Sequence, residues 1–311
     1  MSVLNDDIQN KTILLSALDW GMGHTTRCYC VIRDLLTNDN TVIFAGDEKQ
    51  REWIKREFPE IQAVNLDGYQ IRLDSRKNTY FQLVSQFHQM KQAIRSEKKW
   101  LENYCKENKV DLIISDNRYG FYHGDIESIM LTHQLNLQIP LGRSFVNKKI
   151  KRWLANFNSI WLPDFEDRRL TGQLSKQELN VPIHYIGPLN RFQKENEPIV
   201  FDCLVILSGP EPERSNFLKS ILLQTDQSPE KKWAFVGVEL DQFPSFQNPS
   251  TSTLSKLIAK SDTIISRAGY TTIMELTQLQ KKGVLYPTKG QYEQEYLASK
   301  KFEGITFKND I

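Results

Sequence analysis

Short apolar runs alternate with longer amphipathic stretches along this chain of 311 residues. The apolar runs suit strands that are buried on both faces, and the stretches between them have the spacing of helices that cover a sheet. This alternation restricts the fold more than any other feature of the sequence. It predicts the α/β class, with parallel strands and helices on both faces of each sheet.

The expected strands and helices fall into two series. In the first series, strands are expected at residues 12–17, 41–45, 61–66, 110–115, 126–132 and 159–162, and helices at 25–36, 50–58 and 79–108. The second series starts after Asp202, with strands at 203–208, 233–238, 263–265 and 283–286, and with helices up to Leu223, at 254–260 and from Thr271. Two series predict two sheets, one after the other along the chain.

A polar segment separates the two series. Residues 186–200 are rich in proline, glycine, asparagine and charge, so we expect them to link two domains. The chain also exceeds the usual size of one domain. We therefore predict an N-terminal domain at 1–190 and a C-terminal domain at 191–311. Residues 247–255, rich in serine, threonine and proline, are expected to form a surface loop.

Composition excludes several classes of protein. A net charge of +2 gives no global reason to expect a nucleic-acid partner. No apolar run reaches the length of a membrane span, and the N-terminal residues lack the pattern of a secretory signal, so a cytoplasmic protein is expected. The cysteines match neither a zinc site nor a disulfide framework and are expected to be free thiols. They are Cys28, Cys30, Cys105 and Cys203.

The segment 266–276, SRAGYTTIMEL, joins a glycine turn, hydroxyl groups, an arginine and a carboxylate at the start of an expected helix. A helix N-terminus after a strand presents backbone N–H groups and the positive end of the peptide dipole. A diphosphate could therefore bind there without a metal. Glu275 also stands at capping-box spacing from Thr272, so its alternative role is to cap the helix itself.

A second glycine turn, Gly21-Met-Gly-His24, follows the first expected strand. Thr26 stands where a dinucleotide-binding turn needs its third glycine, which disfavours hydride chemistry with a nicotinamide cofactor. His24 is expected at the carboxyl edge of the sheet, where open α/β folds bind ligands. Its alternative role is to cap the helix or to pair with backbone.

Asp116 follows another buried strand and is expected at the same edge of the sheet as His24. The two side chains could form a base and the group that orients it. The alternative is that Asp116 caps a turn or pairs with Arg118.

Two further polar segments have open interpretations. Residues 287–295 carry short polar side chains that suit sugar hydroxyls, or they form a solvated helix start. The segment from Lys148 to Phe157 is basic and amphipathic, so it could rest weakly on an anionic membrane, at the inner face of the cytoplasmic membrane. A solvated helix face is the favoured interpretation.

Three of these segments together resemble the GT-B glycosyltransferases: residues 21–24, 266–275 and 287–294. The resemblance extends over nearly the whole chain. It is nearest to glycosyltransferase family 28 and to the peptidoglycan N-acetylglucosaminyltransferase that makes lipid II, and indicates a bacterial branch of that group.

The resemblance implies two Rossmann-like domains that face each other across a cleft, with the acceptor on the N-terminal domain and a nucleotide-sugar donor, favoured as a UDP-sugar, on the C-terminal one. It implies inverting, metal-independent transfer of a hexosyl or N-acetylhexosaminyl group, without a cofactor, to an acceptor that is not identified and could be lipid-linked.

The resemblance also implies roles for individual residues. His24 is the base and Asp116 orients it, or Asp116 is the base. Arg267 neutralises the diphosphate, and Glu275 binds the ribose. The other donor-side residues are Gly269, Tyr270, Thr271, Thr272, Gln291, Glu293 and Gln294, and the acceptor-side residues are Gly21, Gly23, Arg27 and Arg118. Two alternatives stay open: a nucleotide-sugar 2-epimerase of the same architecture, and a protein that binds nucleotide sugars without catalysis.

Overall fold

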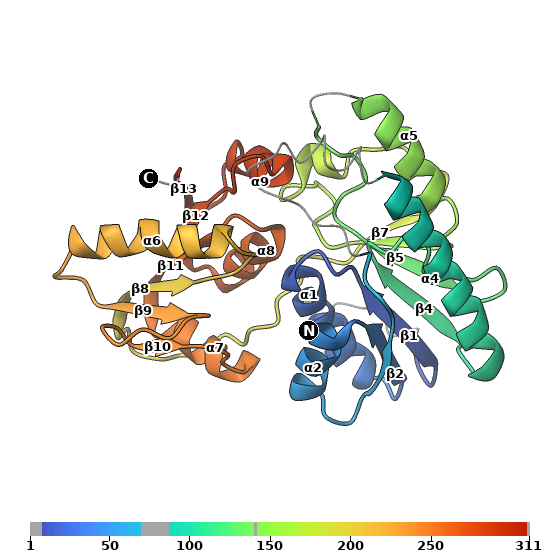
Figure 1. The fold of residues 1–311 in the computed structure, drawn as a ribbon, viewed down its shortest axis with the longest axis horizontal. Helices are drawn as coiled ribbons and strands as arrows, with labels where there is room; N and C mark the ends of the chain where they lie inside the picture. Colours follow the sequence, from blue (N-terminus) through green and yellow to red (C-terminus); the bar gives the residue numbers. More distant parts are fainter. Residues whose placement is uncertain (1–7, 70–86, 140–141, 310–311) are drawn as a thin grey trace. The chain divides into compact units, whose positions relative to one another are not determined.

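The computed structural model describes residues 8–69, 87–139 and 142–309 (Figure 1). It divides into two compact units, Met1–Leu189 and Asn190–Ile311. All the strand pairs within the two sheets are parallel. The predicted α/β class, with two sheets in series, is confirmed.

The described part of the N-terminal unit holds a seven-stranded sheet in the order β3-β2-β1-β4-β5-β6-β7. Its strands are β1 Thr12–Ala17, β2 Thr41–Gly46, β3 Gln62–Asn65, β4 Leu112–Asp116, β5 Ser128–Leu131, β6 Ser159–Leu162 and β7 Ile183–Tyr185. The helices are α1 Met22–Leu36, α2 Glu48–Glu57, α4 Phe87–Glu107 and α5 Arg143–Leu154, with a short 3₁₀ turn at Gly172–Leu174.

Helices cover both faces of this sheet (Figure 1). On one face, Leu101 of α4 packs on Leu14 and Ile113, and Leu154 of α5 packs on Met130. On the other face lie α1 and α2. The chain changes direction between β1 and β4, because the connections that follow these neighbouring strands leave for opposite faces. Such a switch point is where open α/β sheets bind ligands.

The described part of the C-terminal unit holds a six-stranded sheet in the order β10-β9-β8-β11-β12-β13. Its strands are β8 Phe201–Ile206, β9 Trp233–Val236, β10 Ser245–Phe246, β11 Ser261–Arg267, β12 Lys282–Tyr286 and β13 Ile305–Phe307. Its helices are α6 Glu213–Asp226, α7 Thr251–Ala259, α8 Tyr270–Leu279 and α9 Tyr292–Ala298.

The core of this unit lies between α6 and the sheet, where Phe217 packs with Val205, Phe235 and Ile265. The switch point here lies between β8 and β11, because β8 leads through α6 towards β9 while β11 leads through α8 towards β12. Right-handed crossovers in opposite directions put α6 and α8 on opposite faces. The glycine turn before α8 therefore lies at the switch point of this sheet.

Several details differ from the sequence-based expectations. The expected strands do not include β7, β10 and β13, each of which is an end strand of its sheet. α1 begins at Met22, so His24 lies inside the first helical turn. The loop expected at residues 247–255 is wrong in its second half, because the Ser250 side chain accepts a hydrogen bond from Thr253 N and starts α7 there. Residues 79–86 of the expected long helix lie outside the described residues.

Two further expectations can be compared with the structure. The four cysteines are free thiols, as predicted, and Cys28, Cys30 and Cys203 are buried. Residues 186–200 contain no helix or strand, yet Leu189 and Phe192 are buried, so this segment is partly packed. Among the described residues, no helix combines the length and apolar character that crossing a bilayer requires.

Candidate functional site

His24 and Asp116 meet at the carboxyl edge of the N-terminal sheet. Gly21 has φ 89°, a conformation that favours glycine, and α1 begins directly after it. This turn brings His24, in the first turn of α1, next to Asp116, the last residue of β4. Nδ1 of His24 lies 2.6 Å from Oδ1 of Asp116. The predicted pair is therefore present in the structure.

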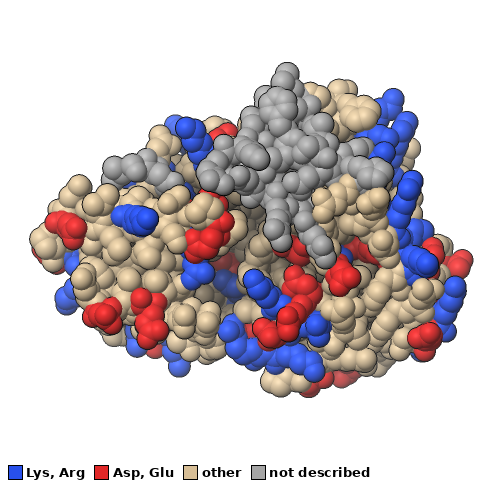
Figure 2. All heavy atoms as spheres, viewed as in Figure 1, with Lys and Arg blue, Asp and Glu red and all other residues tan. Residues whose placement is uncertain are grey.

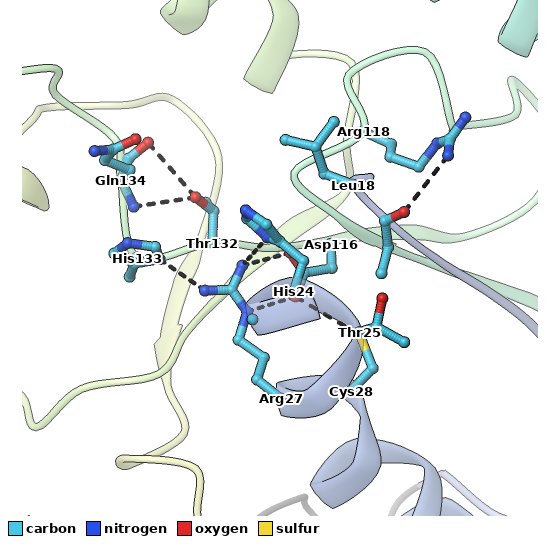
Figure 3. A network of polar contacts seen from close by, with 12 residues as sticks. Leu18, His24, Thr25, Arg27, Cys28, Asp116, Arg118, Thr132, His133 and Gln134 are labelled. Atoms are coloured by element: carbon cyan, nitrogen blue, oxygen red, sulfur yellow. Dashed lines mark hydrogen bonds and ion pairs between the residues drawn. The ribbon is translucent and has the colours of Figure 1, made fainter. Parts of the chain in front are cut away.

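Arg27 binds the same carboxylate (Figure 3). Its Nε donates to Oδ2 of Asp116, and its Nη2 donates to Oδ1. Nη1 of Arg27 lies 2.7 Å from Nδ1 of His133, and Nη2 lies 2.9 Å from Nδ1 of His24. An arginine can only donate, so Nδ1 of His133 accepts and the ring of His133 is neutral.

These contacts keep Asp116 ionised. Burial by itself raises the pKa of this carboxyl, but the Arg27 guanidinium and then His24 outweigh burial, and the pKa is lowered to about 2. Asp116 is fully buried and accepts a further hydrogen bond from the Cys28 thiol, whose own pKa is raised, chiefly by burial. A carboxylate this acidic is a poor proton acceptor, which favours His24 over Asp116 as the base.

The geometry assigns the proton on His24. A separation of 2.6 Å between Nδ1 and a carboxylate oxygen is a hydrogen-bond length, and it is too short for two lone pairs that face each other. Nη2 of Arg27 also lies 2.9 Å from this nitrogen, but it already donates to Oδ1 of Asp116. Because the contact with Asp116 is the shorter one, we assign the proton to Nδ1, which donates to Asp116. The lone pair of the ring is then on Nε2. The His24 side chain is 16% exposed, and Gly21, Met22 and Gly23 beside it are exposed, so solvent reaches this end of α1.

Two of the alternative roles of His24 and Asp116 are wrong. No side-chain hydrogen bond caps α1, so His24 does not cap its own helix. Asp116 does not pair with Arg118, because Arg118 binds Glu97 of α4 instead. Arg27, which was predicted on the acceptor-side loop, has a buried side chain that binds Asp116.

Arg118 lies in the interior of the N-terminal unit, not on the surface of the predicted acceptor loop. Its Nη2 donates to the carbonyl of Asp67 at 2.7 Å, and its Nε donates to Glu97. The other oxygen of Glu97 accepts from Tyr69 Oη and from Gly120 N, both at 2.8 Å. These contacts hold the loop after β4 against α4, which gives Arg118 a structural role.

In the C-terminal unit, the backbone of the turn before α8 is not crowded by side chains at Gly269. Gly269 is the N-cap of α8, and no side chain caps this helix. A Cβ atom added at Gly269 would meet only Thr272 Oγ1, at 3.9 Å. Tyr270 of the same turn is buried, whereas Thr271 and Thr272 are partly exposed. The predicted helix start at Thr271 is one residue late, since α8 begins at Tyr270.

Arg267 ends β11 next to this turn, but its guanidinium lies against α6. Its Nη2 donates to the Glu213 carbonyl at 3.3 Å, and its Cζ lies 4.4 Å from the ring centre of Phe217. The side chain is buried. The Arg267 guanidinium is therefore held against α6 in this structure.

Glu275 does not cap α8, which corrects the capping alternative. Its carboxylate is buried and lies 3.0 Å from Nε of Arg191, a residue of the preceding linker segment. Burial raises the pKa of Glu275 to about 7, although the Arg191 charge opposes this shift. The carboxyl is thus balanced between its two protonation states near neutral pH.

The segment after β12 is held by α9. Thr288 N donates to Gln294 Oε1 at 2.8 Å, and Nε2 of Gln294 donates to Gln291 at 2.6 Å. Gly290 N donates to Glu295. Glu293 is partly exposed in the first turn of α9. Three of the predicted sugar-reading side chains, Gln291, Glu293 and Gln294, therefore gather at the start of one helix.

The segment predicted to contact a membrane forms α5 and the turn after it. Leu154 and Phe157 are buried in the core of the N-terminal unit, so the apolar face of the segment is used for packing. Lys148, Lys151 and Arg152 are exposed, and Figure 2 shows Lys and Arg side chains over this helix. This arrangement is that of a solvated helix face.

Sequence reasoning missed His133, Glu97 and Arg191. A signal existed for His133: it stands two residues after β5, Asp116 ends the neighbouring strand β4, and neighbouring parallel strands end at the same edge. Glu97 and Arg191 gave no such signal, because each lies far along the chain from its partner. Within the described ranges, His, Cys, Asp and Glu side chains do not gather in threes as a metal site would require.

Comparison with known proteins gives a family match in the C-terminal unit. Residues 210–305 match the glycosyltransferase family 28 C-terminal domain. A protein of Methanosarcina acetivorans described as an uncharacterized glycosyltransferase is 23% identical, over 91% of this chain and 79% of its own length.

Solved structures match nearly the whole chain. Arabidopsis thaliana UGT89C1 complexed with UDP-L-rhamnose has a TM-score of 0.65 at 12% identity, over 97% of this chain and 86% of its own. Spinosyn rhamnosyltransferase SpnG complexed with thymidine diphosphate has a TM-score of 0.60 at 11% identity, over 93% of this chain and 84% of its own. The lipid II specificity implied by the sequence resemblance stays a prediction. The chain has the two-sheet α/β fold of the GT-B glycosyltransferases, and its C-terminal unit carries the family 28 match.

Proposed function

We propose that this protein is an inverting glycosyltransferase that moves a sugar from a nucleotide-diphosphate donor to a hydroxyl group of an acceptor. The observation that carries the proposal is the 2.6 Å hydrogen bond between His24 and the buried, ionised Asp116. It leaves the lone pair of His24 on Nε2, at the end of α1 that solvent reaches. A neutral imidazole held in this tautomer is a typical general base.

The reaction would proceed in one displacement. Nε2 of His24 takes the proton of the acceptor hydroxyl while its oxygen attacks the anomeric carbon of the donor sugar. The bond from that carbon to the diphosphate breaks, and the nucleoside diphosphate leaves with the electron pair. The new glycosidic bond forms on the opposite face of the sugar, so the configuration inverts. Asp116 stays ionised and stabilises the imidazolium that forms.

The donor would bind the C-terminal unit. The N-terminus of α8 after Gly269 suits the diphosphate, because first-turn N–H groups and the helix dipole favour negative charge. Glu275 would accept from the ribose hydroxyls, and Gln291, Glu293 and Gln294 would read the sugar. Two structural neighbours carry UDP-L-rhamnose and thymidine diphosphate, which supports a nucleotide-diphosphate donor. We favour a UDP-sugar.

We propose that the protein acts in the cytoplasm. For the segment from Lys148 to Phe157 we propose a solvated helix face rather than a membrane contact, since Leu154 and Phe157 are already buried in the core.

Ligand binding is tested by thermal unfolding with UDP, thymidine diphosphate, ADP and their sugars. A ligand present at a hundred times its dissociation constant adds about 2.7 kcal/mol of stability. We expect the uridine compounds to give the largest rise in Tm. Equal Tm values across the panel would contradict a nucleotide-diphosphate donor.

Chemistry is tested on the donor that binds. Slow hydrolysis of the donor, or transfer to an added acceptor, should fall about 10²- to 10⁴-fold in His24→Ala and remain in the matched control His184→Ala, whose histidine is exposed in β7. An epimerase would change the sugar of the donor with no acceptor present. A binding protein would show the same donor affinity in both variants and no turnover in either.

A further inference from the structure

An open cavity of about 280 Å³ lies in the N-terminal unit, between α4, the loop after β4 and the end of α5. α4 and α5 cover one face of the seven-stranded sheet, whereas α1, which carries His24 and Arg27, lies on the other face (Figure 1). The cavity is therefore separate from the pair of His24 and Asp116. None of the residues that line it has a role in the proposed transfer.

One wall of the cavity is positively charged. Lys91, Arg95 and Lys98 line it from α4, and their spacing of four and three residues places them on one face of that helix. Lys98 pairs with Glu102 at 3.5 Å. Among the residues that the structure describes, the exposed Arg95 has no ion pair, and no carboxylate lines the cavity. The protein itself therefore leaves positive charge on this wall without a counter-charge.

The rest of the cavity is largely aromatic. Tyr119 and Tyr122 line it from the loop after β4, and Trp153 lines it from α5. The ring centres of Tyr119 and Trp153 are 5.1 Å apart, and Nζ of Lys98 lies 3.7 Å from the ring centre of Tyr122. The backbone of Tyr119 is also held, because its N–H donates to Oη of Tyr69 at 3.0 Å. A fixed apolar surface thus lies beside the cations.

The Tyr119 hydroxyl adds a hydrogen-bond donor. Burial raises the pKa of this phenol, so the hydroxyl keeps its proton at neutral pH. Within the described part of the chain, this hydroxyl makes no hydrogen bond. An anionic group in the cavity could therefore accept from it without breaking a contact of the protein.

We propose that this cavity binds a small organic anion, in which an aromatic ring packs against Tyr119 and Trp153 and a phosphate or carboxylate on the ring pairs with Arg95. A guanidinium suits both anions, because its N–H groups form a planar fork. Ligand sites are mostly apolar cavities of about 300–1,000 Å³ with a few polar groups, so this cavity of about 280 Å³ suits one substituted ring. Such binding does not depend on the proposed transfer.

Neither the charge nor the aromatic surface is sufficient alone. An exposed ion pair contributes little to binding, and salt screens it. An uncharged ring would leave the Arg95 guanidinium without a partner. A ligand that carries both parts should therefore bind more tightly than either part.

The test uses phenyl phosphate as the probe, with inorganic phosphate and phenol as its two parts. We expect calorimetry at low salt to give a dissociation constant for phenyl phosphate that is lower by about tenfold than for either part, the scale of one aromatic contact. The indole N–H signal of Trp153 should move when phenyl phosphate is added. Equal affinities for phenyl phosphate and inorganic phosphate, or an unmoved Trp153 signal, would overturn the proposal.

Variants of the two walls test the contacts. Arg95→Gln should raise the dissociation constant of phenyl phosphate by about fivefold, the scale of an exposed ion pair, and leave that of phenol unchanged. Tyr119→Phe removes only the hydroxyl and should raise it by about threefold. The matched control is Lys99→Gln, which removes an exposed cation of α4 that does not line the cavity and should leave binding unchanged. Equal weakening in Arg95→Gln and Lys99→Gln would overturn the proposal, because only the general charge of the helix would then matter.

Two further comparisons exclude other sites for the anion. Weaker binding of phenyl phosphate in Gly269→Ala but not in Arg95→Gln would place the anion at α8 and overturn the proposal. Sedimentation with phosphatidylglycerol vesicles tests a membrane surface as the source of the phosphate. Vesicle binding that Arg95→Gln removes, without binding of phenyl phosphate, would replace the proposal by a membrane contact. His24→Ala should bind phenyl phosphate unchanged, so failure of the proposed transfer would leave this result intact.

Discussion

The carboxylate of Glu275 and the guanidinium of Arg191 lie 3.0 Å apart inside the C-terminal unit. Burial of Glu275 outweighs this attraction, so the pKa of the carboxyl is raised from 4.5 to about 7. A group whose pKa rises on folding stabilises the fold below its unfolded pKa, and that contribution is lost as the pH rises through the folded value.

Because of Glu275, the free energy of unfolding should therefore decrease as the pH rises from 4.5 to 8. The rise in the pKa of Glu275 corresponds to about 3 kcal/mol, because one pKa unit is worth about 1.4 kcal/mol. Glu275→Gln should lack this part of the pH dependence. Urea unfolding of both proteins across this range measures the difference. The control Glu303→Gln removes an exposed carboxyl and should follow the unaltered protein. Parallel curves for Glu275→Gln and the unaltered protein would contradict the prediction.

His24→Ala and Asp116→Asn should differ in stability although both remove activity. His24 is partly exposed, so its loss should cost turnover, by about 10²- to 10⁴-fold, with little change in Tm. Asp116→Asn also leaves the buried Arg27 without a counter-charge, which should cost about 3–5 kcal/mol of unfolding free energy. Chemical denaturation measures both variants. Asp125→Asn, at an exposed carboxylate, is the control and should match the unaltered protein.

Gly269→Ala should weaken nucleotide binding while the fold remains. The added Cβ meets only Thr272 Oγ1 at 3.9 Å, so it has space in the ligand-free protein, and the loss at an N-cap should be about 1 kcal/mol or less. A diphosphate close to the backbone of this turn would collide with the new methyl group. We expect calorimetry to give a dissociation constant for UDP that is at least tenfold higher than in the unaltered protein. Gly124→Ala, where a Cβ meets nothing within 4 Å, is the control. Unchanged affinity would place the diphosphate elsewhere.

Glu97→Ala should destabilise the N-terminal unit strongly. Its carboxylate is buried and satisfies Arg118, Tyr69 and the backbone of Gly120. The loss of one partner of a buried ion pair costs about 3–5 kcal/mol. Glu102→Ala, on the same helix, removes only the partly exposed pair with Lys98 and should cost less than about 1 kcal/mol. Similar unfolding free energies for the two variants would rule out the structural role of Glu97.

In the N-terminal sheet, β1 and β6 have the bounds expected from the sequence, and in the C-terminal sheet β12 begins one residue earlier than expected. These strands are continuous apolar runs because both of their faces are covered. The short strands β7, β10 and β13 lack such runs: none has more than three residues, and their residues are mostly half-exposed. A strand of this kind forms because a neighbouring strand offers hydrogen bonds, which is information that the local sequence does not contain.

The sequence predicted only part of the candidate site. His24 and Asp116 could be placed together because parallel strands end at one edge of a sheet. The partners of the charged residues could not be predicted. Arg27 lies 89 residues from Asp116 along the chain and was placed on a loop, yet it is buried and binds that carboxylate. Arg118 stands two residues after Asp116 and binds Glu97 of α4 instead.

The sequence by itself determined the class of the fold, the order of its main elements and the edge of each sheet where polar residues gather, because these follow from apolar periodicity and from the glycine turns. The tertiary structure alone decided which charges meet. Burial makes an unpaired charge costly, so Arg27, Arg118 and Glu275 are each paired with the counter-charge that packing brings within reach. That selection holds Asp116 ionised beside His24, on which the proposed chemistry depends.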